Sequence, residues 1–299
     1  MNHLVFPGIG ERSPASKTAG APLAYSPSGW NAELSLRFAR NDKRTTLVRR
    51  NHSGPLLVQK PLYPEGEETC HALIVHPPGG IAGGDQLRLN VALDAGAHAL
   101  LSTPGAGKWY KANHAGAGQR LDFAVERSGI LEWLPQETIV FNAASARLRT
   151  RVELAGDARY AGWEILCLGR RASGERFEQG EMRQRTQLYR DDQLLWSEHM
   201  LLRGDDPLLR SPIGMRGHTV TATFLIAHGT MPRALLEQCR VLEADDGAAR
   251  GVTALPGIFA ARYLGDSAQQ ARRYFEKIWA VARPWYAARP AQALRIWST

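Results

Sequence analysis

The segment from Cys70 to Leu93, CHALIVHPPGGIAGGDQLRLNVAL, most constrains the fold of this chain. It begins with a short apolar run, Ala72–Val75, that predicts a buried strand. Two prolines end this strand because each fixes φ and removes a backbone donor, and four glycines then allow a tight reversal. After Asp85, apolar and polar residues alternate, which predicts a half-buried strand. The connecting loop is too rich in glycine and proline to be an ordinary turn.

Short strands are predicted along most of the remaining chain. Turns that combine an acid with a glycine recur after these strands, at 93–96, 126–129 and 155–157. Their spacing is too irregular for a strict solenoid repeat. The pattern predicts a mainly β fold with many short strands in a layered or helically wound scaffold.

A few helices are expected in the C-terminal third. Pro232 suits the first turn of one of them. The clearest helix spans Ser267–Ala282, where apolar residues recur at the spacing of one helix face. Asp266 and Gln269 resemble a capping box at its start, and Pro284 is expected to end it. We expect this helix to pack on the β core.

The domain organisation is expected to be simple. Residues 1–29 are rich in Gly, Pro, Ser and Ala and predict a flexible leader. No linker is evident within 30–299, which predicts a single β-rich domain. No apolar run reaches the length of a signal-peptide core or a membrane span, so a cytoplasmic protein without a membrane partner is expected. The cysteines are too far apart to indicate a disulfide framework or a CxxC metal site.

The charge balance is basic, with 37 Lys and Arg against 29 Asp and Glu, for a net charge of +8. Such a balance suits an acidic protein, nucleic acid or an anionic membrane as partner. The sequence has no zinc-finger spacing and no aromatic RNA-binding signature, which argues against nucleic acid. A basic surface that docks an acidic protein is the expected reading of the charge.

Three glutamates lie on apolar faces of predicted strands: Glu132, Glu164 and Glu198. A buried carboxylate costs several kcal/mol unless it is paired, protonated or hydrated. One interpretation is a salt bridge to a nearby cation. The candidate cations are Arg120, Arg170 and Arg171. The other interpretation is a polar passage through the β core, which would also hydrate the acids.

Catalytic motifs are not evident. The sequence contains no G-x-S-x-G, no HExxH, no Cys pair, and no complete phosphate loop around Gly107-Lys108. Two of the glutamates could still serve glycoside hydrolysis, because β-wound folds host such enzymes. A scattered set of Glu, Asp and His would instead hold a divalent ion such as nickel weakly, which suits transfer rather than storage. The candidates for such a transient nickel path are Asp85, Glu164, Glu198, Glu132 and His76.

The loop HPPGGIAGGD (76–85) has two interpretations. As a structural device it turns the chain, and Asp85 caps the turn by accepting backbone N–H groups. Alternatively, its glycines permit close backbone approach where another protein docks or an ion path begins. The residues of interest are His76, Pro77, Pro78, Gly79, Gly80, Gly83, Gly84 and Asp85.

This loop resembles the signature of the urease accessory protein D family, UreD or UreH. LEWLPQETIVF (131–141), the GRR and GERFEQG segments within 169–180, and the final RIWST (295–299) resemble the same family in the same order. The resemblance covers roughly residues 30 to 299.

The resemblance implies a non-catalytic, β-rich accessory protein for urease maturation. Such a scaffold would bind apo-urease on one side and the accessory F protein on the other, and through F the nickel-carrying GTPase, the G protein. No cofactor would be tightly bound, and nickel would be in transit through an internal tunnel. The alternatives are a β-wound carbohydrate-active enzyme that uses paired glutamates, and a basic protein-binding module.

Overall fold

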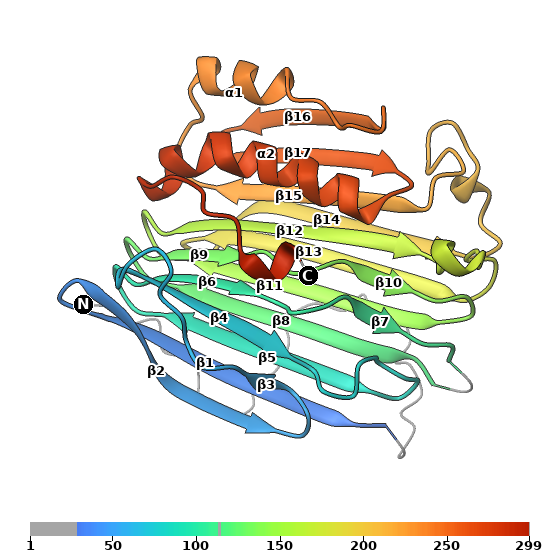
Figure 1. The fold of residues 1–299 in the computed structure, drawn as a ribbon, viewed down its shortest axis with the longest axis horizontal. Helices are drawn as coiled ribbons and strands as arrows, with labels where there is room; N and C mark the ends of the chain where they lie inside the picture. The colour runs from blue at the N-terminus through green and yellow to red at the C-terminus, as the bar shows by residue number, and fades with distance from the viewer. Residues whose placement is uncertain (1–28, 113–114, 299) are drawn as a thin grey trace.

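The computed structural model describes residues 29–112 and 115–298, and most of its regular structure is β-strand (Figure 1). The predicted leader, 1–29, lies outside the described residues except for Gly29. One sheet has seven strands, in the order β14 (Gln193–Arg203), β13 (Glu181–Arg190), β11 (Ser145–Leu154), β8 (Ala117–Val125), β5 (Gln86–Leu93), β1 (Asn31–Asn41) and β2 (Arg44–Ser53).

The other sheet has ten strands. Its main order is β16 (Ala249–Leu255), β17 (Ile258–Gly265), β15 (Val220–Ala227), β12 (Arg159–Leu168), β9 (Ile130–Trp133), β6 (His98–Ser102), β4 (Thr69–Val75) and β3 (Leu57–Val58). Two short strands, β10 (Thr138–Val140) and β7 (Gly107–Trp109), extend from β12. The helices are α1 (Arg233–Arg240) and α2 (Ala268–Ala287), with 3-10 turns at Arg171–Ser173, Pro207–Leu209 and Arg295–Ser298.

The chain winds back and forth between the two sheets. It passes from β4 to β5, from β6 to β8, from β9 to β11 and from β12 to β13. Successive strands within each sheet are parallel along β4-β6-β9-β12 and along β5-β8-β11-β13. The prediction of a mainly β, helically wound scaffold with helices late in the chain is therefore confirmed.

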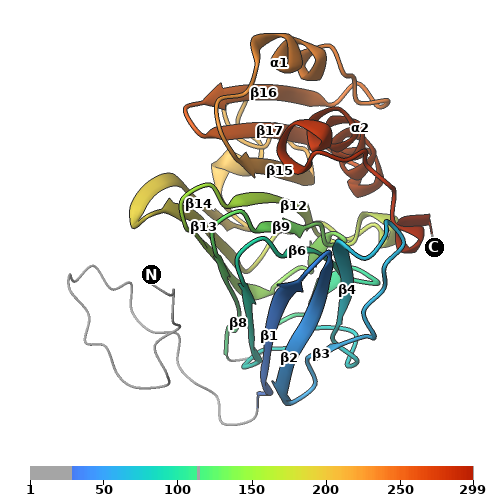
Figure 2. The ribbon, with the colours of Figure 1, turned by 90° about the vertical axis from the view of Figure 1, so that its left-hand side faces the viewer.

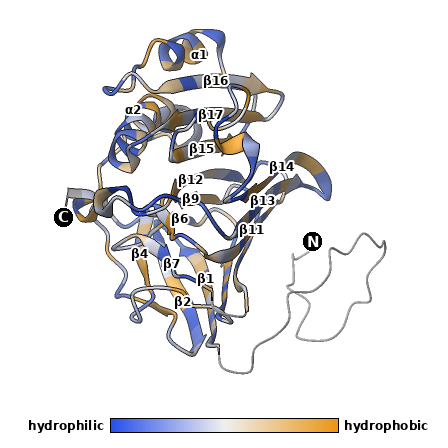
Figure 3. Cartoon of the chain, turned by 90° about the vertical axis from the view of Figure 1, so that its right-hand side faces the viewer, coloured by the Kyte–Doolittle hydropathy of each residue, from blue (hydrophilic) through white to orange (hydrophobic). Residues whose placement is uncertain are grey.

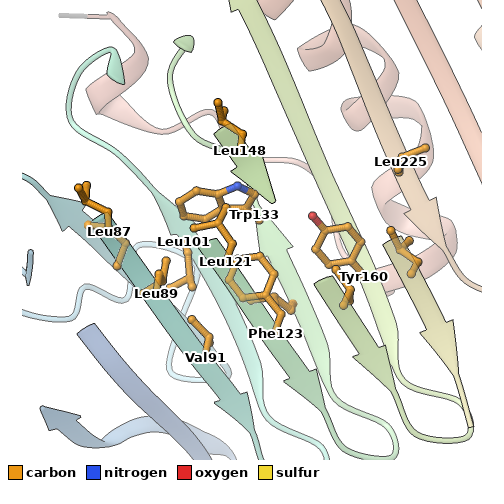
Figure 4. Packing of buried hydrophobic residues seen from close by; sticks show 14 of the residues in the cluster. Leu87, Leu89, Val91, Leu101, Leu121, Phe123, Trp133, Leu148, Tyr160 and Leu225 are labelled. Atoms are coloured by element: carbon orange, nitrogen blue, oxygen red, sulfur yellow. The ribbon is translucent and has the colours of Figure 1, made fainter. Parts of the chain in front are cut away.

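The first hydrophobic core lies between the sheets. Strand β5 places Leu87, Leu89 and Val91 inward, because alternate residues of a strand point to opposite faces. Phe123 of β8 packs beside Trp133 of β9, with ring centroids 5.7 Å apart (Figure 4). Figure 3 shows that the strands carry both hydrophilic and hydrophobic residues, as expected when one face is buried.

A second core forms on the opposite face of the ten-stranded sheet, where α2 packs against β12, β15 and β17 (Figure 2). The predicted apolar face of the helix is buried. Its residues are Ala271, Tyr274, Phe275, Ile278, Trp279 and Ala282. Trp163 of β12 contacts Phe275 at 6.3 Å and Trp297 of the last 3-10 turn at 5.2 Å between ring centroids. The end of the chain thus closes this core, and the expectation that the helix is a packing element agrees with its burial.

Both predicted ends of α2 need correction. Ser267 caps the helix by accepting from the Gln270 amide at 3.2 Å, whereas the Asp266 carboxylate accepts from the Thr219 amide at 3.0 Å. Pro284 lies inside the helix, which continues to Ala287. The helix passes the proline because the side chains on either side of it, Arg283 and Tyr286, are anchored in the buried interior. Among the described residues, no helix combines the length and apolar character needed to cross a membrane.

Candidate functional site: a cavity between the sheets

A cavity of about 310 Å³ lies between the two sheets beneath the 76–85 loop. Its walls are mostly apolar side chains of both sheets, among them Leu89 and Leu121 from one sheet and Ile74 and Trp133 from the other. A small set of polar residues also lines it. These residues are His76, Thr103, Lys108, Gln119, Gln136, Thr138 and Glu164. An apolar pocket with a few convergent polar groups is the usual form of a binding site.

The 76–85 loop is held over the cavity by pairing with strand β7. The Ile81 amide donates to the Lys108 carbonyl at 2.7 Å, and the Tyr110 amide donates to the Ile81 carbonyl at 2.8 Å. A Cβ on Gly80 would lie 2.1 Å from the Tyr110 ring, so this position admits no side chain without movement. The close approach that glycine permits here is therefore to the chain's own aromatic ring.

Asp85 is buried and shapes the loop. Its Oδ2 accepts from the Ala82 amide at 2.7 Å, and its Oδ1 accepts from the Trp30 amide at 2.8 Å. The carboxylate thus caps the turn, as the structural interpretation expected, and also fixes the start of β1. Gly84, just before it, has φ of +93°, a conformation that favours glycine.

Glu164 of β12 points into the cavity from the face of the ten-stranded sheet that the seven-stranded sheet covers. Burial raises the pKa of its carboxyl to about 7, and the nearby side chains of Trp133 and Thr150 only partly oppose that rise. The group therefore changes charge near neutral pH. None of the three arginines expected to pair with the acids forms a salt bridge with it.

His76 lies at the end of β4 and lines the same cavity. Burial lowers the pKa of its imidazole, with the Asp85 charge acting in the opposite sense. Its Nε2 is buried and has no hydrogen-bond partner among the described residues. A neutral imidazole with a free ring nitrogen is the form of histidine that ligates metals.

Glu132 of β9 faces the other way, toward α2, and is completely buried. Its carboxylate accepts from Arg283 Nη2 at 2.9 Å, His98 Nε2 at 2.7 Å and Trp279 Nε1 at 2.8 Å. The Tyr286 hydroxyl donates to it as well, at 2.8 Å. Every expected hydrogen-bonding direction of this carboxylate is thus filled by the protein.

The electrostatics of this second cluster keep Glu132 ionised. Burial alone raises the pKa of its carboxyl, but His98 and Arg283 outweigh burial and hold the pKa well below its ordinary value. Burial lowers the pKa of His98, so its neutral ring donates from Nε2 and accepts from the Thr69 hydroxyl at 3.2 Å. Arg283 also contacts Glu65, with 2.9 Å between Nη2 and Oε1. The cluster is a closed structural joint between α2 and the sheet.

Glu198 of β14 lies outside both clusters. It forms a salt bridge with Arg262 of β17, with 2.6 Å between Nη1 and Oε1, at the edge where the two sheets meet. The expected cation partners of the acids were wrong. Arg120 pairs with Asp122, Arg170 with Glu175 and Arg171 with Asp266.

The structure therefore brings His76 and Glu164 together in one cavity and leaves Asp85, Glu132 and Glu198 outside its described lining. Within 29–112 and 115–298, no group of three or more His, Cys, Asp or Glu side chains is placed to hold a metal ion. Sequence reasoning missed Gln119, Gln136 and Lys108 at the cavity, because neutral amides and an exposed lysine carry no pattern of their own.

The chain is similar to known proteins of one family. The sequence profile of a family described as "UreD urease accessory protein" matches residues 31–298. A protein of Methylobacillus flagellatus named "Urease accessory protein UreD" is 50% identical over 276 residues, which cover 92% of this chain and 97% of the relative. A Dechloromonas aromatica protein with the same name is 52% identical over 278 residues, covering 92% and 96%. A Pseudomonas fluorescens relative, also so named, is 50% identical over 280 residues, covering 93% and 98%.

Proposed function

Because the chain belongs to the UreD urease accessory protein family, which supports a role in urease maturation, we propose that it is a non-catalytic scaffold for nickel insertion. It binds apo-urease and the accessory F protein in the cytoplasm, and it associates through F with the nickel-carrying G protein. Nickel is the cargo of this complex and passes through the scaffold without a tightly bound cofactor. The protein thereby acts as a metallochaperone component, and the names of its relatives support the coarser role of a urease accessory protein.

The observation that carries the nickel proposal is that His76 and Glu164 both line one cavity between the sheets. Imidazole and carboxylate are both accepted as ligands by nickel. The imidazole is held neutral, with Nε2 free among the described residues. The Glu164 carboxyl, with its pKa raised by burial to about 7, is readily ionised by an approaching cation. Two such groups attract Ni²⁺ without enclosing it.

The other two glutamates do not line this cavity, and we leave them out of the proposed path. Glu132 is saturated by buried donors, and Glu198 is paired with Arg262. Glu132 and Glu164 also face opposite sides of the ten-stranded sheet. This placement does not support a paired-carboxylate glycoside hydrolase, because its two acids must flank one substrate bond.

The test is to assemble variants with urease and the other accessory proteins, then measure complex recovery and the nickel content of the urease. Glu164→Lys is expected to leave the complex intact and lower the nickel content, because a cation in the cavity repels the cargo. Glu198→Lys makes the same charge change outside the cavity and is expected to leave both quantities unchanged. Normal nickel content with Glu164→Lys would remove the cavity from the path. If Glu164→Lys fails to assemble, the nearly isosteric Glu164→Gln removes the carboxylate without adding a cation, and it is expected to lower the nickel content because the attraction for Ni²⁺ is lost.

A further inference from the structure

The outer face of the seven-stranded sheet carries four arginines in one continuous row. Arg88 of β5 pairs in register with Arg120 of β8, Arg120 with Arg149 of β11, and Arg149 with Arg185 of β13. Neighbouring strands lie only about 4.8 Å apart, and like charges directly opposite one another destabilise a sheet. The row therefore works against the stability of the free protein.

Few acids neutralise this row. Asp122 pairs with Arg120, but Arg88, Arg149 and Arg185 make no ion pair within the described part of the chain. The Nε of Arg149 is buried and has no hydrogen-bond partner there. Burial is the main cause that lowers the pKa of Arg149; the neighbouring Arg120 and Arg185 add to it, and Asp122 acts in the opposite sense.

A hollow of about 360 Å³ opens on this face beside the row. Its lining includes Arg88, Arg120 and Arg149 of the row, and also Arg147. Arg147 lies on β11 two residues before Arg149 and on the same face of the strand. Gly118 of β8, in register with Arg147, contributes no side chain, and the Gln86 side-chain amide of β5 lies over it at the wall of the hollow. The four arginines around the hollow offer many N–H donors. The negative charges described beside them are Glu33 in the lining and Asp122, which pairs with Arg120.

We propose that this arginine face, formed by Arg88, Arg120, Arg147, Arg149 and Arg185, docks a carboxylate-rich segment of a partner protein. The planar guanidinium matches a carboxylate in a bidentate pair, and the hollow admits several acidic side chains. Such a segment also removes the repulsion within the row. The arginine side chains lie on the face of the seven-stranded sheet opposite the cavity, and the hollow and the cavity share Leu87 and Gln119 in their linings.

Two other occupants fit less well. The chain's own first 28 residues contain one acid, Glu11, beside the cations Arg12 and Lys17, so they lack the necessary charge. Single-stranded nucleic acid needs exposed aromatic rings on which bases stack. The row itself has none, and the nearby Tyr189 ring on β13 is covered by the Arg151 guanidinium, 4.1 Å from its centroid.

The experiment titrates the full chain with a fluorescent poly-glutamate peptide of about ten residues and follows fluorescence anisotropy at low salt. The double variant Arg88→Gln/Arg149→Gln is expected to weaken binding roughly tenfold or more, the loss of two charge-assisted contacts. Arg233→Gln/Arg273→Gln, which removes two exposed arginines from α1 and α2, is the matched control and should bind within about twofold of the parent. A poly-glutamine peptide of equal length should not bind.

Three results would overturn the proposal. Equal weakening by the two double variants would show that the peptide responds to net charge alone. Unchanged binding in Arg88→Gln/Arg149→Gln would place the acidic site elsewhere. Tighter binding of a single-stranded oligonucleotide than of poly-glutamate, lost in the same variant, would identify the face as a nucleic-acid surface. Circular dichroism of each variant confirms that the sheet is intact.

Discussion

The Arg283 guanidinium on α2 lies 2.9 Å from the Glu132 carboxylate on β9, and both side chains are completely buried. The two opposite charges compensate one another, and each partner also has a neutral hydrogen-bond partner. Arg283 donates to the Pro290 carbonyl, and Glu132 accepts from the Tyr286 hydroxyl. This joint connects the C-terminal helix to a strand 151 positions earlier in the chain. These directional hydrogen bonds fix the position of α2 on the sheet, in addition to the burial of its apolar side chains.

Arg283→Met should destabilise the fold by roughly 3–5 kcal/mol, because it leaves two buried carboxylates, Glu132 and Glu65, without their cation. The measurement is the free energy of unfolding from a urea titration. Arg273→Met, on the exposed side of the same helix, is the control and should change the value by less than about 0.5 kcal/mol. Equal midpoints for the two variants would contradict a structural role for the joint.

Trp279→Ala should cost roughly 3–5 kcal/mol, as large-to-small changes in a core do. Trp279→Phe retains most of the ring but loses the Nε1 donor to Glu132 and Tyr286, and should cost about 1–3 kcal/mol. Melting temperatures of the two variants separate the packing from the polar contribution. A Trp279→Ala protein with an unchanged melting temperature but lost partner binding would instead identify α2 as an interface.

Glu164 should make stability fall as pH rises toward neutrality. Its carboxyl has an ordinary pKa of 4.5 and a folded-state pKa of about 7, so the folded state binds more protons between these values. The contribution is fully present below 4.5 and is lost as pH rises through 7. Glu164→Gln should therefore flatten the decline in unfolding free energy between about pH 5 and pH 8. Glu198→Gln is the control, and a slope that survives in Glu164→Gln would assign the titration to another group.

Arg149→Gln should stabilise the free protein by about 0.2–1 kcal/mol, because it removes like-charge contacts with Arg120 and Arg185. The gain should shrink as salt is added, since screening weakens the repulsion in the parent protein. Thermal unfolding at low and high salt measures both effects. Arg233→Gln, an isolated exposed change, should show neither, and a loss of stability in Arg149→Gln would refute the repulsion.

Much of the fold could be predicted from the sequence because strand alternation is local. Glu164 lies on an apolar face of β12, as the sequence predicted. The recurring turns in the sequence indicated that short strands follow one another. They did not indicate which strands pair within each of the two sheets. The strands from Val220 onward were not predicted, although Pro256-Gly257 marks the turn between β16 and β17.

The candidate site was less predictable because its contacts are not local. The sequence indicated that the buried acids need partners, but the partner of Glu132 is Arg283 and not one of the nearby arginines. The end of α2 was misplaced for the same reason, since contacts across the molecule hold the helix beyond Pro284. His76 and Glu164 were both named, yet only the winding of the sheets places them around one cavity.

The remote origin of the Arg283 side chain has a consequence for biosynthesis. While the chain is being made, β9 emerges long before α2, so Glu132 must wait for its cation until nearly the whole sequence has left the ribosome. The strands of the two sheets can pair progressively in that time. The unpaired Glu132 carboxylate, however, opposes the removal of water from the face of the ten-stranded sheet that α2 will cover. Closure is thereby delayed to the last step of synthesis. Chains that terminate before residue 283 lack this cation and leave the Glu132 charge without its partner.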